Sequence, residues 1–151
     1  MPFAGLVDQR VYVDSNAFVY FLERHPEFYE RVLPLFEAAA QGRLQLVTSE
    51  LSVAELLVQP YKMGRADIAA TYRRFLKDEG LIDLVPVSLN VLEAAAASRG
   101  TLGGSLADAI HVATASLFDC AAFVTNDHRI RSAPPLKIIQ LAQNVHSASD
   151  R

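Results

Sequence analysis

Four acidic side chains occupy positions in the sequence that suit chemistry better than packing. Asp108 lies within LADAIHVATA (106–115), a helical pattern that is otherwise apolar, and Glu55 lies in the helical pattern ELSVAELLVQ (50–59). Asp14 ends the run RVYVD, and Asp127 follows the run AAFVTN. An ionised carboxylate that leaves water is costly unless it is paired or binds a metal. These four residues are therefore candidate ligands of a cation.

Carboxylates that share one site repel one another, so such a site needs a compensating positive charge. Oxygen ligands of this kind suit Mg²⁺ or Mn²⁺, whereas the sequence has no Cys or His spacing that favours zinc. A magnesium ion held by a few carboxylates keeps positions that phosphate oxygens can occupy, and it can lower the pKa of a bound water. The reaction class that we expect is hydrolysis of a phosphodiester bond.

Each acid also has a purely structural interpretation. Two of them complete the S-x-x-D or S-x-x-E spacing of a capping box, in which a Ser and a later acid satisfy a helix N-terminus. The other two can cap a helix or close a turn. We prefer a shared site, because the structural interpretation needs four unrelated coincidences at the same end of one sheet. The residues concerned are Ser105 with Asp108, Ser52 with Glu55, Asp14 before a helix that begins at Ser15 or Asn16, and Asn126 with Asp127.

The elements that position the acids alternate between two hydrophobic periods. Short β-branched runs are typical of strands, and the longer segments between them repeat at helical spacing. This alternation predicts βαβ units, a mostly parallel five-stranded sheet and helices on both of its faces. The expected strands are 10–15, 44–49, 82–87, 121–125 and 136–141. The expected helices are 16–24, 26–42, 50–60, 65–80, 89–100 and 105–119.

Three prolines and one glycine set expected boundaries within these helices. Pro26 suits the first turn of the segment 26–42, and Gly42 suits its end. Pro34 lies inside the same segment and predicts a kink or a break, because proline lacks the N–H that a helix interior uses. The segment 50–60 is expected to remain helical only as far as Pro60.

This topology predicts where the chemistry lies. In open parallel sheets, ligands bind outside the carboxyl ends of the strands. Asp14 and Asp127 lie at two such ends, Glu55 lies in the helix that follows a strand, and Asp108 lies one turn into the helix that precedes another. We therefore expect all four acids to converge above one edge of the sheet.

Composition and charge narrow the class of protein. The 151 residues suit one domain with a sizeable core, and 51% hydrophobic with 21% charged residues is typical of a globular protein. Cys120 is the single cysteine, which excludes an internal disulfide. No apolar run reaches the roughly 18 residues of a membrane span, and the N-terminus lacks a secretory pattern, so we expect a cytoplasmic protein without membrane attachment. The net charge of −3 provides no general attraction for nucleic acid.

Four motifs, taken in order, resemble those of a known family. VYVDSNAF, VTSELSVAELL, LADAIHVATA and FVTND are similar to the four acidic motifs of PIN-domain ribonucleases, and the likeness extends from about Val11 to Leu141. Within that family the S-x-x-E of the second motif and the D-A-I-x-x-A-T-A of the third are most similar to VapC-type toxins. The resemblance implies a single PIN-like domain over residues 1–151, with a core of about 10–142, folded as a three-layer α/β/α sandwich.

The resemblance also implies an activity and a set of site residues. The activity would be that of a Mg²⁺- or Mn²⁺-dependent endoribonuclease with Asp14, Glu55, Asp108 and Asp127 as catalytic metal ligands. Asn16, Thr125 and Asn126 match polar positions that support such a site. Arg129 and Arg131 follow Asp127 directly, and we expect them to contact phosphates of the RNA substrate.

Partners follow from the same likeness. A VapC-type toxin would bind a small cognate antitoxin, which inhibits it by placing a basic side chain at the acidic cleft. The apolar segments NAFVYFLE and YERVLPLF would support a homodimer.

Two side chains near the motifs are assigned to packing rather than to chemistry. His111 lies one turn beyond Asp108 and is expected to be a packed or supporting residue outside the catalytic set. Tyr12 is expected to belong to the core or an interface.

Three alternatives remain open from the sequence. A haloacid-dehalogenase-like phosphatase also places an Asp at the end of its first strand, but it needs a second Asp where this chain has Asn16. A receiver domain is disfavoured because the strand IDLVPV lacks a phosphorylatable Asp. A catalytically inactive PIN-like module that binds RNA or protein is opposed by the complete set of four acids.

Overall fold

The computed structural model describes residues 3–142, which contain five strands and six α-helices. The strands are β1 (Arg10–Val13), β2 (Gln45–Ser49), β3 (Ile82–Val85), β4 (Ala122–Thr125) and β5 (Lys137–Gln140). The helices are α1 (Ser15–Leu22), α2 (Tyr29–Ala40), α3 (Glu50–Lys62), α4 (Ala66–Lys77), α5 (Leu89–Leu102) and α6 (Leu106–Leu117), and a short 3-10 helix, η1 (Ala4–Leu6), precedes β1. Within this range, no helix has both the length and the apolarity that crossing a membrane requires.

The five strands form one sheet in the order β3-β2-β1-β4-β5, and every neighbouring pair is parallel. β1 is the central strand, where Tyr12 pairs with Val47 of β2 on one side and with Phe123 of β4 on the other. Val11, Tyr12 and Val13 are fully buried, as expected for a parallel strand that is covered on both faces. The predicted five-stranded α/β sheet is confirmed.

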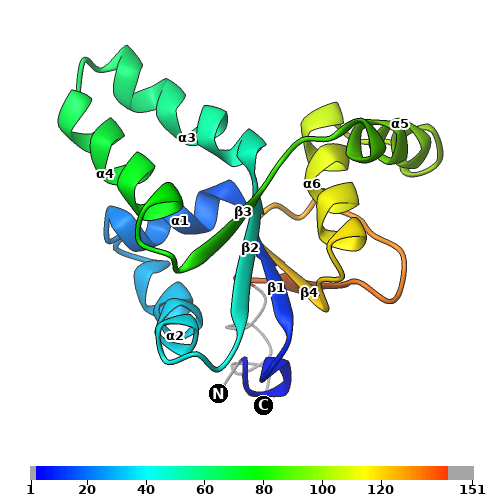
Figure 1. Ribbon diagram of the computed structural model, residues 1–151, viewed down its shortest axis with the longest axis horizontal. Coiled ribbons are helices and arrows are strands. Elements are labelled where there is room, and N and C mark those ends of the chain that lie inside the picture. Colours follow the sequence, from blue (N-terminus) through cyan, green and yellow to red (C-terminus); the bar gives the residue numbers. More distant parts are fainter. Residues whose placement is uncertain (1–2, 143–151) are drawn as a thin grey trace.

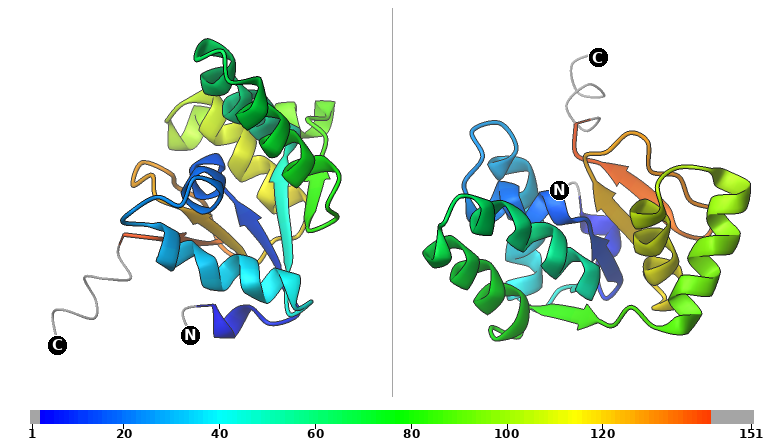
Figure 2. Two further views of the ribbon diagram at one scale, coloured as in Figure 1. Left: turned by 90° about the vertical axis from the view of Figure 1, so that its left-hand side faces the viewer. Right: turned by 90° about the horizontal axis from the view of Figure 1, so that it is seen from above.

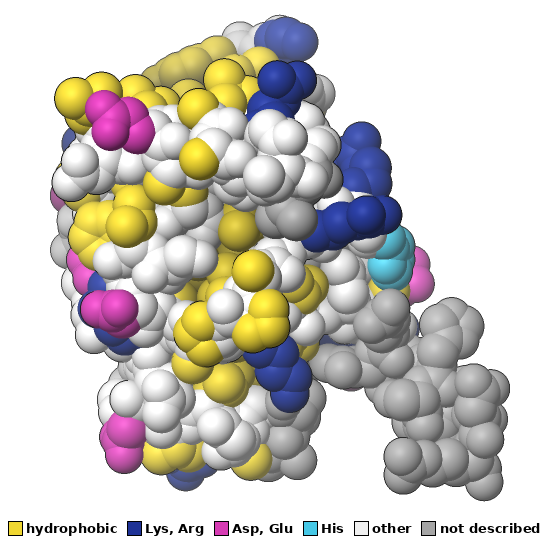
Figure 3. Space-filling model, turned by 90° about the vertical axis from the view of Figure 1, so that its right-hand side faces the viewer, with side chains coloured by type: hydrophobic (Ala, Val, Ile, Leu, Met, Phe, Trp, Pro, Cys, Tyr) yellow, Lys and Arg dark blue, Asp and Glu magenta, His cyan; other side chains and the backbone are white. Residues whose placement is uncertain are grey.

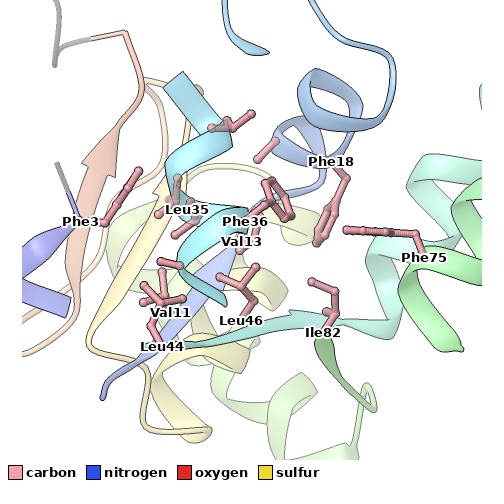
Figure 4. Packing of buried hydrophobic residues seen from close by; sticks show 14 of the residues in the cluster. Phe3, Val11, Val13, Phe18, Leu35, Phe36, Leu44, Leu46, Phe75 and Ile82 are labelled. Carbon is pink, nitrogen blue, oxygen red and sulfur yellow. The ribbon is translucent and has the colours of Figure 1, made fainter. Parts of the chain in front are cut away.

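Helices α1 to α4 cover one face of the sheet, and α6 covers the other with α5 packed against it (Figures 1 and 2). Because side chains alternate along a strand, Val11 and Val13 point into the larger core, where aromatic side chains meet them (Figure 4). The ring of Phe18 from α1 lies edge-on to Phe36 of α2 and Phe75 of α4, with centroid distances of 5.8 and 6.2 Å. The three-layer α/β/α sandwich is therefore confirmed.

The second face of the sheet holds α6 firmly. The rings of Tyr12 and Phe123 stack with their centroids 4.8 Å apart, and Val112 of α6 packs against them. On its outer side α6 contacts α5, where Val91 packs with Ala113. Since the sheet and α5 both cover it, α6 presents its first turns from a fixed backbone.

Side-chain caps decide where the helices begin. Ser105 caps α6 by accepting a hydrogen bond from the N–H of Asp108, so the S-x-x-D pair does serve as a cap. The S-x-x-E capping box at Ser52 and Glu55 is wrong. Ser49 caps α3 three residues earlier, which places Ser52 fully buried inside the helix and leaves Glu55 without a capping role.

Proline positions depart from the sequence-based expectation. α2 begins at Tyr29, so Pro26 precedes it, and α2 runs through Pro34 without a break. α3 likewise continues past Pro60 to Lys62. In both helices buried side chains on the core face, such as Leu35 in α2, hold the helix in place and outweigh the one hydrogen bond that each proline removes.

Candidate active site

Asp14 lies at the carboxyl end of the central strand and is 8% exposed. Its Oδ1 accepts a hydrogen bond from the N–H of Ser15 (2.8 Å), which caps α1. Its Oδ2 accepts one from the hydroxyl of Thr125 (2.6 Å) at the end of β4. Burial raises the pKa of this carboxyl, and the Thr125 hydrogen bond opposes that rise in part. The predicted capping role of Asp14 is confirmed, and the carboxylate is also strongly desolvated.

Thr125 joins Asp14 to a second acid. Its Oγ1 accepts a hydrogen bond from the main-chain N–H of Asp127 (3.0 Å). The carboxylate of Asp127 accepts from Nε and Nη2 of Arg129 (both 3.0 Å) and from the Arg129 main-chain N–H (2.9 Å). These hydrogen bonds with Arg129 lower the pKa of Asp127. Among residues 3–142, no Lys or Arg side chain pairs with Asp14, whereas Asp127 already has a counter-ion in Arg129.

Glu55 reaches the site through His111. Glu55 Oε1 lies 2.6 Å from Nε2 of His111, and Nδ1 of the same ring lies 2.5 Å from the hydroxyl of Tyr12. His111 is 1% exposed, whereas the side chain of Glu55 is 33% exposed. A negative charge on Glu55 raises the pKa of Asp14, so Glu55 lies near the same edge of the sheet as Asp14.

Asp108 lies in the first turn of α6, half-buried. Together with Arg129 and Arg131 it lines a small surface hollow that Gly103 and Gly104 complete. The charge of Asp108 contributes to the raised pKa of Arg129. Arg129 is therefore influenced by two acids, Asp108 at the start of α6 and Asp127 just after β4.

The amide side chains beside the acids are only partly hydrogen-bonded. Asn126 donates from Nδ2 to the hydroxyl of Tyr20 (3.1 Å), and Gln140 of β5 donates to the main-chain carbonyl of Asp127 (3.0 Å). Among residues 3–142, the side-chain oxygens of Asn16, Asn126 and Gln140 are buried without a hydrogen-bond partner. Buried oxygens of this kind are expected to bind water or a ligand.

The predicted site residues are linked, but they do not form one compact metal shell. Asp14, Thr125 and Asp127 are connected by hydrogen bonds, and Glu55 approaches them through His111. Asp108 faces the hollow that Arg129 lines. Over the described range 3–142, no group of three or more Asp, Glu, His or Cys side chains is close enough to hold a single ion.

The chemistry of the donors nevertheless fits Mg²⁺ or Mn²⁺. Mg²⁺ is usually held by one or two carboxylates and keeps several waters, so it does not require all four acids in direct contact. Within residues 3–142, the hydrogen bonds to Asp14 come from Ser15 and Thr125, neither of which is cationic. A positive charge beside this desolvated carboxylate would stabilise its ionised form.

One functional group was underestimated by reasoning from the sequence. Tyr12 packs on Phe123 as expected, but its hydroxyl also contacts His111 and the N–H of Ser49. A signal was present in the sequence, because Tyr12 lies two residues before Asp14 and therefore shares its face of the strand. The expectation that His111 is a packed, supporting residue agrees with its burial.

The fold and the site define a class, an α/β/α sandwich with an acidic site at the carboxyl edge of a parallel sheet. The sequence profile of the PIN domain matches residues 11–134. The chain therefore belongs to the PIN domain family, a family of nucleases. This assignment replaces the phosphatase and receiver-domain alternatives. No curated protein sequence matches the chain significantly.

Solved structures share this fold at low sequence identity. A chain in the structure of VapBC2 from Rickettsia felis, bound to a DNA fragment from the promoter, is 19% identical, with a TM-score of 0.67 over 87% of this chain and 98% of that one. A chain of DNA-bound VapBC from Salmonella typhimurium is 15% identical, with a TM-score of 0.68 over 88% and 98%. A chain of FitAcB from Neisseria gonorrhoeae is 19% identical, with a TM-score of 0.65 over 87% of this chain and 98% of that one.

Proposed function

We propose that this chain is a divalent-metal-dependent endoribonuclease and the toxin of a toxin–antitoxin pair. The observation that carries the proposal is the hydrogen-bonded arrangement of Asp14, Thr125 and Asp127 at the carboxyl edge of a PIN-domain sheet. Asp14 is a buried carboxylate with a raised pKa and, within residues 3–142, no Lys or Arg partner, and strongly perturbed carboxylates of this kind are frequent at functional sites.

We assign Asp14, Glu55, Asp108 and Asp127 to holding Mg²⁺ or Mn²⁺. When bound, such an ion makes a nearby water more acidic and stabilises charge on the phosphodiester oxygens. Neighbouring residues hold two of these carboxylates in place. Thr125 and the start of α1 fix the two oxygens of Asp14, and the capped first turn of α6 fixes Asp108.

RNA is the substrate that we propose. The net charge of −3 means that RNA binding must rely on local basic side chains. The side chain of Arg129 is 84% exposed beside Asp127, and Arg131 is exposed next to it. Lys and Arg side chains also gather along one edge of the face that carries α5 and α6 (Figure 3). In our proposal Arg129 and Arg131 contact phosphates next to the cleaved bond.

The proposed partner is an inhibitory antitoxin. The structures with the same fold include VapBC, FitAB and a toxin–antitoxin complex from Klebsiella pneumoniae, and we extend that kind of partner to this chain. An antitoxin that places a basic side chain at the acidic cleft would compensate the charge of Asp14. We further propose that the chain is cytoplasmic and forms a homodimer.

Cleavage of single-stranded RNA by the purified chain tests the enzymatic part of this proposal. We expect cleavage with Mg²⁺ or Mn²⁺, none with excess EDTA, and a loss of at least about 100-fold in kcat for Asp14→Asn and Asp108→Asn. Asp78→Asn is the matched control. It makes the same chemical change at an exposed residue that lies before the amino end of β3, away from the site. Cleavage by both site variants at the wild-type rate would refute the assignment. Metal-independent RNA binding without cleavage would favour an inactive PIN-like module.

Growth measurements test the toxin assignment. Induced expression of the chain should arrest growth of a bacterial host, and Asp14→Asn should not. Co-expression of a small protein encoded beside the chain should restore growth, and the two should elute as one complex from a sizing column. Light scattering on the purified chain measures whether it is a dimer. A chain that cleaves RNA but is harmless when expressed would be a processing enzyme rather than a toxin.

A further inference from the structure

A chain of hydrogen bonds connects three elements beneath the candidate site. Tyr12 on β1, His111 on α6 and Glu55 on α3 are joined through distances of 2.5 and 2.6 Å. Tyr12 and His111 are 0% and 1% exposed, and only Glu55 reaches the surface. The proposed nuclease activity of the four acids assigns no role to Tyr12 or His111.

The Glu55 carboxylate determines the direction of the chain. An ionised carboxylate can only accept, so the hydrogen bond between Glu55 Oε1 and His111 Nε2 places a ring proton on Nε2. A neutral imidazole has one donor and one acceptor nitrogen. In a neutral ring Nδ1 is therefore the acceptor, and the Tyr12 hydroxyl donates its proton to it. The Tyr12 oxygen in turn accepts from the main-chain N–H of Ser49 (3.2 Å).

Two further contacts fix Tyr12 itself. Its ring stacks on Phe123 with a centroid distance of 4.8 Å, and Ser49, which binds its hydroxyl, is the N-cap of α3. Tyr12 thus contacts the start of the helix that carries Glu55 and, through His111, the Glu55 carboxylate as well. The neighbouring Thr48 hydroxyl donates to the carbonyl of Val13 (2.9 Å) and bonds the Ser52 hydroxyl (2.8 Å), so this part of α3 is held by buried polar contacts throughout.

Glu55 has another direction in which it could turn. Its side chain also borders a groove between α1, α3 and α4, whose apolar walls include Leu56, Met63 and Ile68. Within the described residues, His111 is the hydrogen-bond partner of Glu55. Without that donor, the three rotatable bonds of the glutamate side chain would leave its carboxylate free to move away from Asp14.

We propose that Tyr12 and His111 are positioning residues that hold the Glu55 carboxylate at the acidic site, with Tyr12 selecting the His111 tautomer that donates to it. The inference rests on the proposed nuclease function for its effect on catalysis, but the tautomer and the orientation of Glu55 are properties of the folded chain. Partners of this kind around metal-binding groups typically change metal affinity or activity by about 10- to 100-fold when they are removed.

Two substitutions of His111 separate positioning from simple packing. The amide nitrogen of a Gln occupies nearly the place of Nε2, so His111→Gln retains a donor for Glu55. The amide of an Asn lies nearer the place of Nδ1, so His111→Asn retains a partner for Tyr12 but not for Glu55. Both variants remove the buried ring. If the histidine only packed, they would differ in stability by the methylene group that Asn lacks, but not in Mn²⁺ affinity.

The measurements are kcat, KM for RNA and the affinity for Mn²⁺ by calorimetry, beside the midpoint of thermal unfolding. We expect His111→Asn to lose about 10- to 100-fold in kcat or in Mn²⁺ affinity, while His111→Gln stays within about threefold of the wild type. We expect Tyr12→Phe to weaken Mn²⁺ binding as well, since its ring packs as before but it no longer selects the tautomer. Equal kcat and equal Mn²⁺ affinity for the Asn and Gln variants would overturn the proposal.

The tautomer is measured directly and independently of activity. In ¹⁵N-labelled wild-type protein without metal, the imidazole spectrum of His111 should show a proton on Nε2, and Tyr12→Phe should shift the ring toward the other tautomer. A neutral His111 protonated on Nδ1 in the wild type would overturn the inference, even if both His111 variants failed to fold. A wild-type chain without nuclease activity would refute only the proposed function, because Mn²⁺ affinity and the tautomer still decide the role of His111.

Discussion

Replacing Thr125 by valine removes a hydroxyl that bonds to both Asp14 and Asp127. The substitution keeps the shape of a fully buried residue but deletes its hydroxyl. The hydrogen bond to the Asp14 carboxylate is charge-assisted and contributes about 1.5–3 kcal/mol, and a buried N–H left without an acceptor at Asp127 costs about 1–3 kcal/mol. The added methyl group offsets about 1 kcal/mol by its burial.

The expected net loss is about 2–4 kcal/mol in the free energy of unfolding, because the Asp127 N–H is only partly buried. For a chain of this size, such a loss lowers the midpoint of thermal unfolding by about 4–16 °C. Thr125→Ser is the matched control, because it keeps the hydroxyl and removes only a methyl group, at about 1 kcal/mol. Urea denaturation of the three proteins at pH 7.5 measures the difference.

The pH dependence of this loss tests its cause. The Thr125 hydroxyl favours the ionised form of Asp14 and lowers its pKa, against the larger effect of burial. Removing the hydroxyl therefore raises the Asp14 pKa of the Val variant above that of the wild type. The loss is complete above the variant pKa, and it shrinks as the pH falls from that value to the wild-type one, because the folded variant binds the proton first. An equal free energy of unfolding for the Val and Ser variants at pH 7.5, or a gap that stays unchanged while NMR shows Asp14 becoming protonated in both proteins, would refute the reasoning.

Three other predictions concern single groups. Asp14→Asn should raise the unfolding midpoint at neutral pH without metal, because burial raises the Asp14 pKa and penalises its ionised form; denaturation at a series of pH values should show the gain vanishing as the wild-type carboxyl becomes protonated. Arg129→Ala should raise the pKa of Asp127 toward its ordinary value, as measured by carboxyl NMR titration, whereas the control Arg131→Ala should leave it unchanged. The Cys120 thiol is buried, which raises its pKa to about 12, so a thiol reagent at pH 8 should modify it only after denaturant is added; rapid modification of the folded chain would contradict its burial.

The sequence was sufficient for the five strands, the helices between them and the sheet edge at which Asp14 and Asp127 lie. Alternating periods predict strands such as β1 and β4 correctly because both are buried on two faces and consist of apolar, largely β-branched or aromatic residues. The positions of Asp14 and Asp127 after these strands then follow from parallel topology. Local rules performed less well within helices, since Pro34 and Pro60 are tolerated where tertiary packing exceeds one lost hydrogen bond.

The finer arrangement of the site depends on tertiary contacts that sequence patterns do not encode. No spacing in the sequence indicates that Arg129 binds Asp127 through two of its guanidinium nitrogens, Nε and Nη2, because an arginine two residues after an acid can equally face solvent. The S-x-x-E pattern at Ser52 was misleading, since Ser49 offered a cap earlier in the same segment. The role of the Tyr12 hydroxyl is not predictable from the sequence, because the aromatic ring of a tyrosine in a buried strand is explained by core packing alone.

The connection between Tyr12 and His111 has a consequence for the evolution of related chains. The two positions are separated by 99 residues, yet each supplies what the other lacks, a phenolic proton and a ring nitrogen to accept it. A mutation at either position alone leaves a buried polar group unsatisfied, whereas a double exchange to apolar residues removes both groups at once. Among relatives with this fold, a tyrosine two residues before the first acid and a histidine three residues after the third should therefore be gained and lost together.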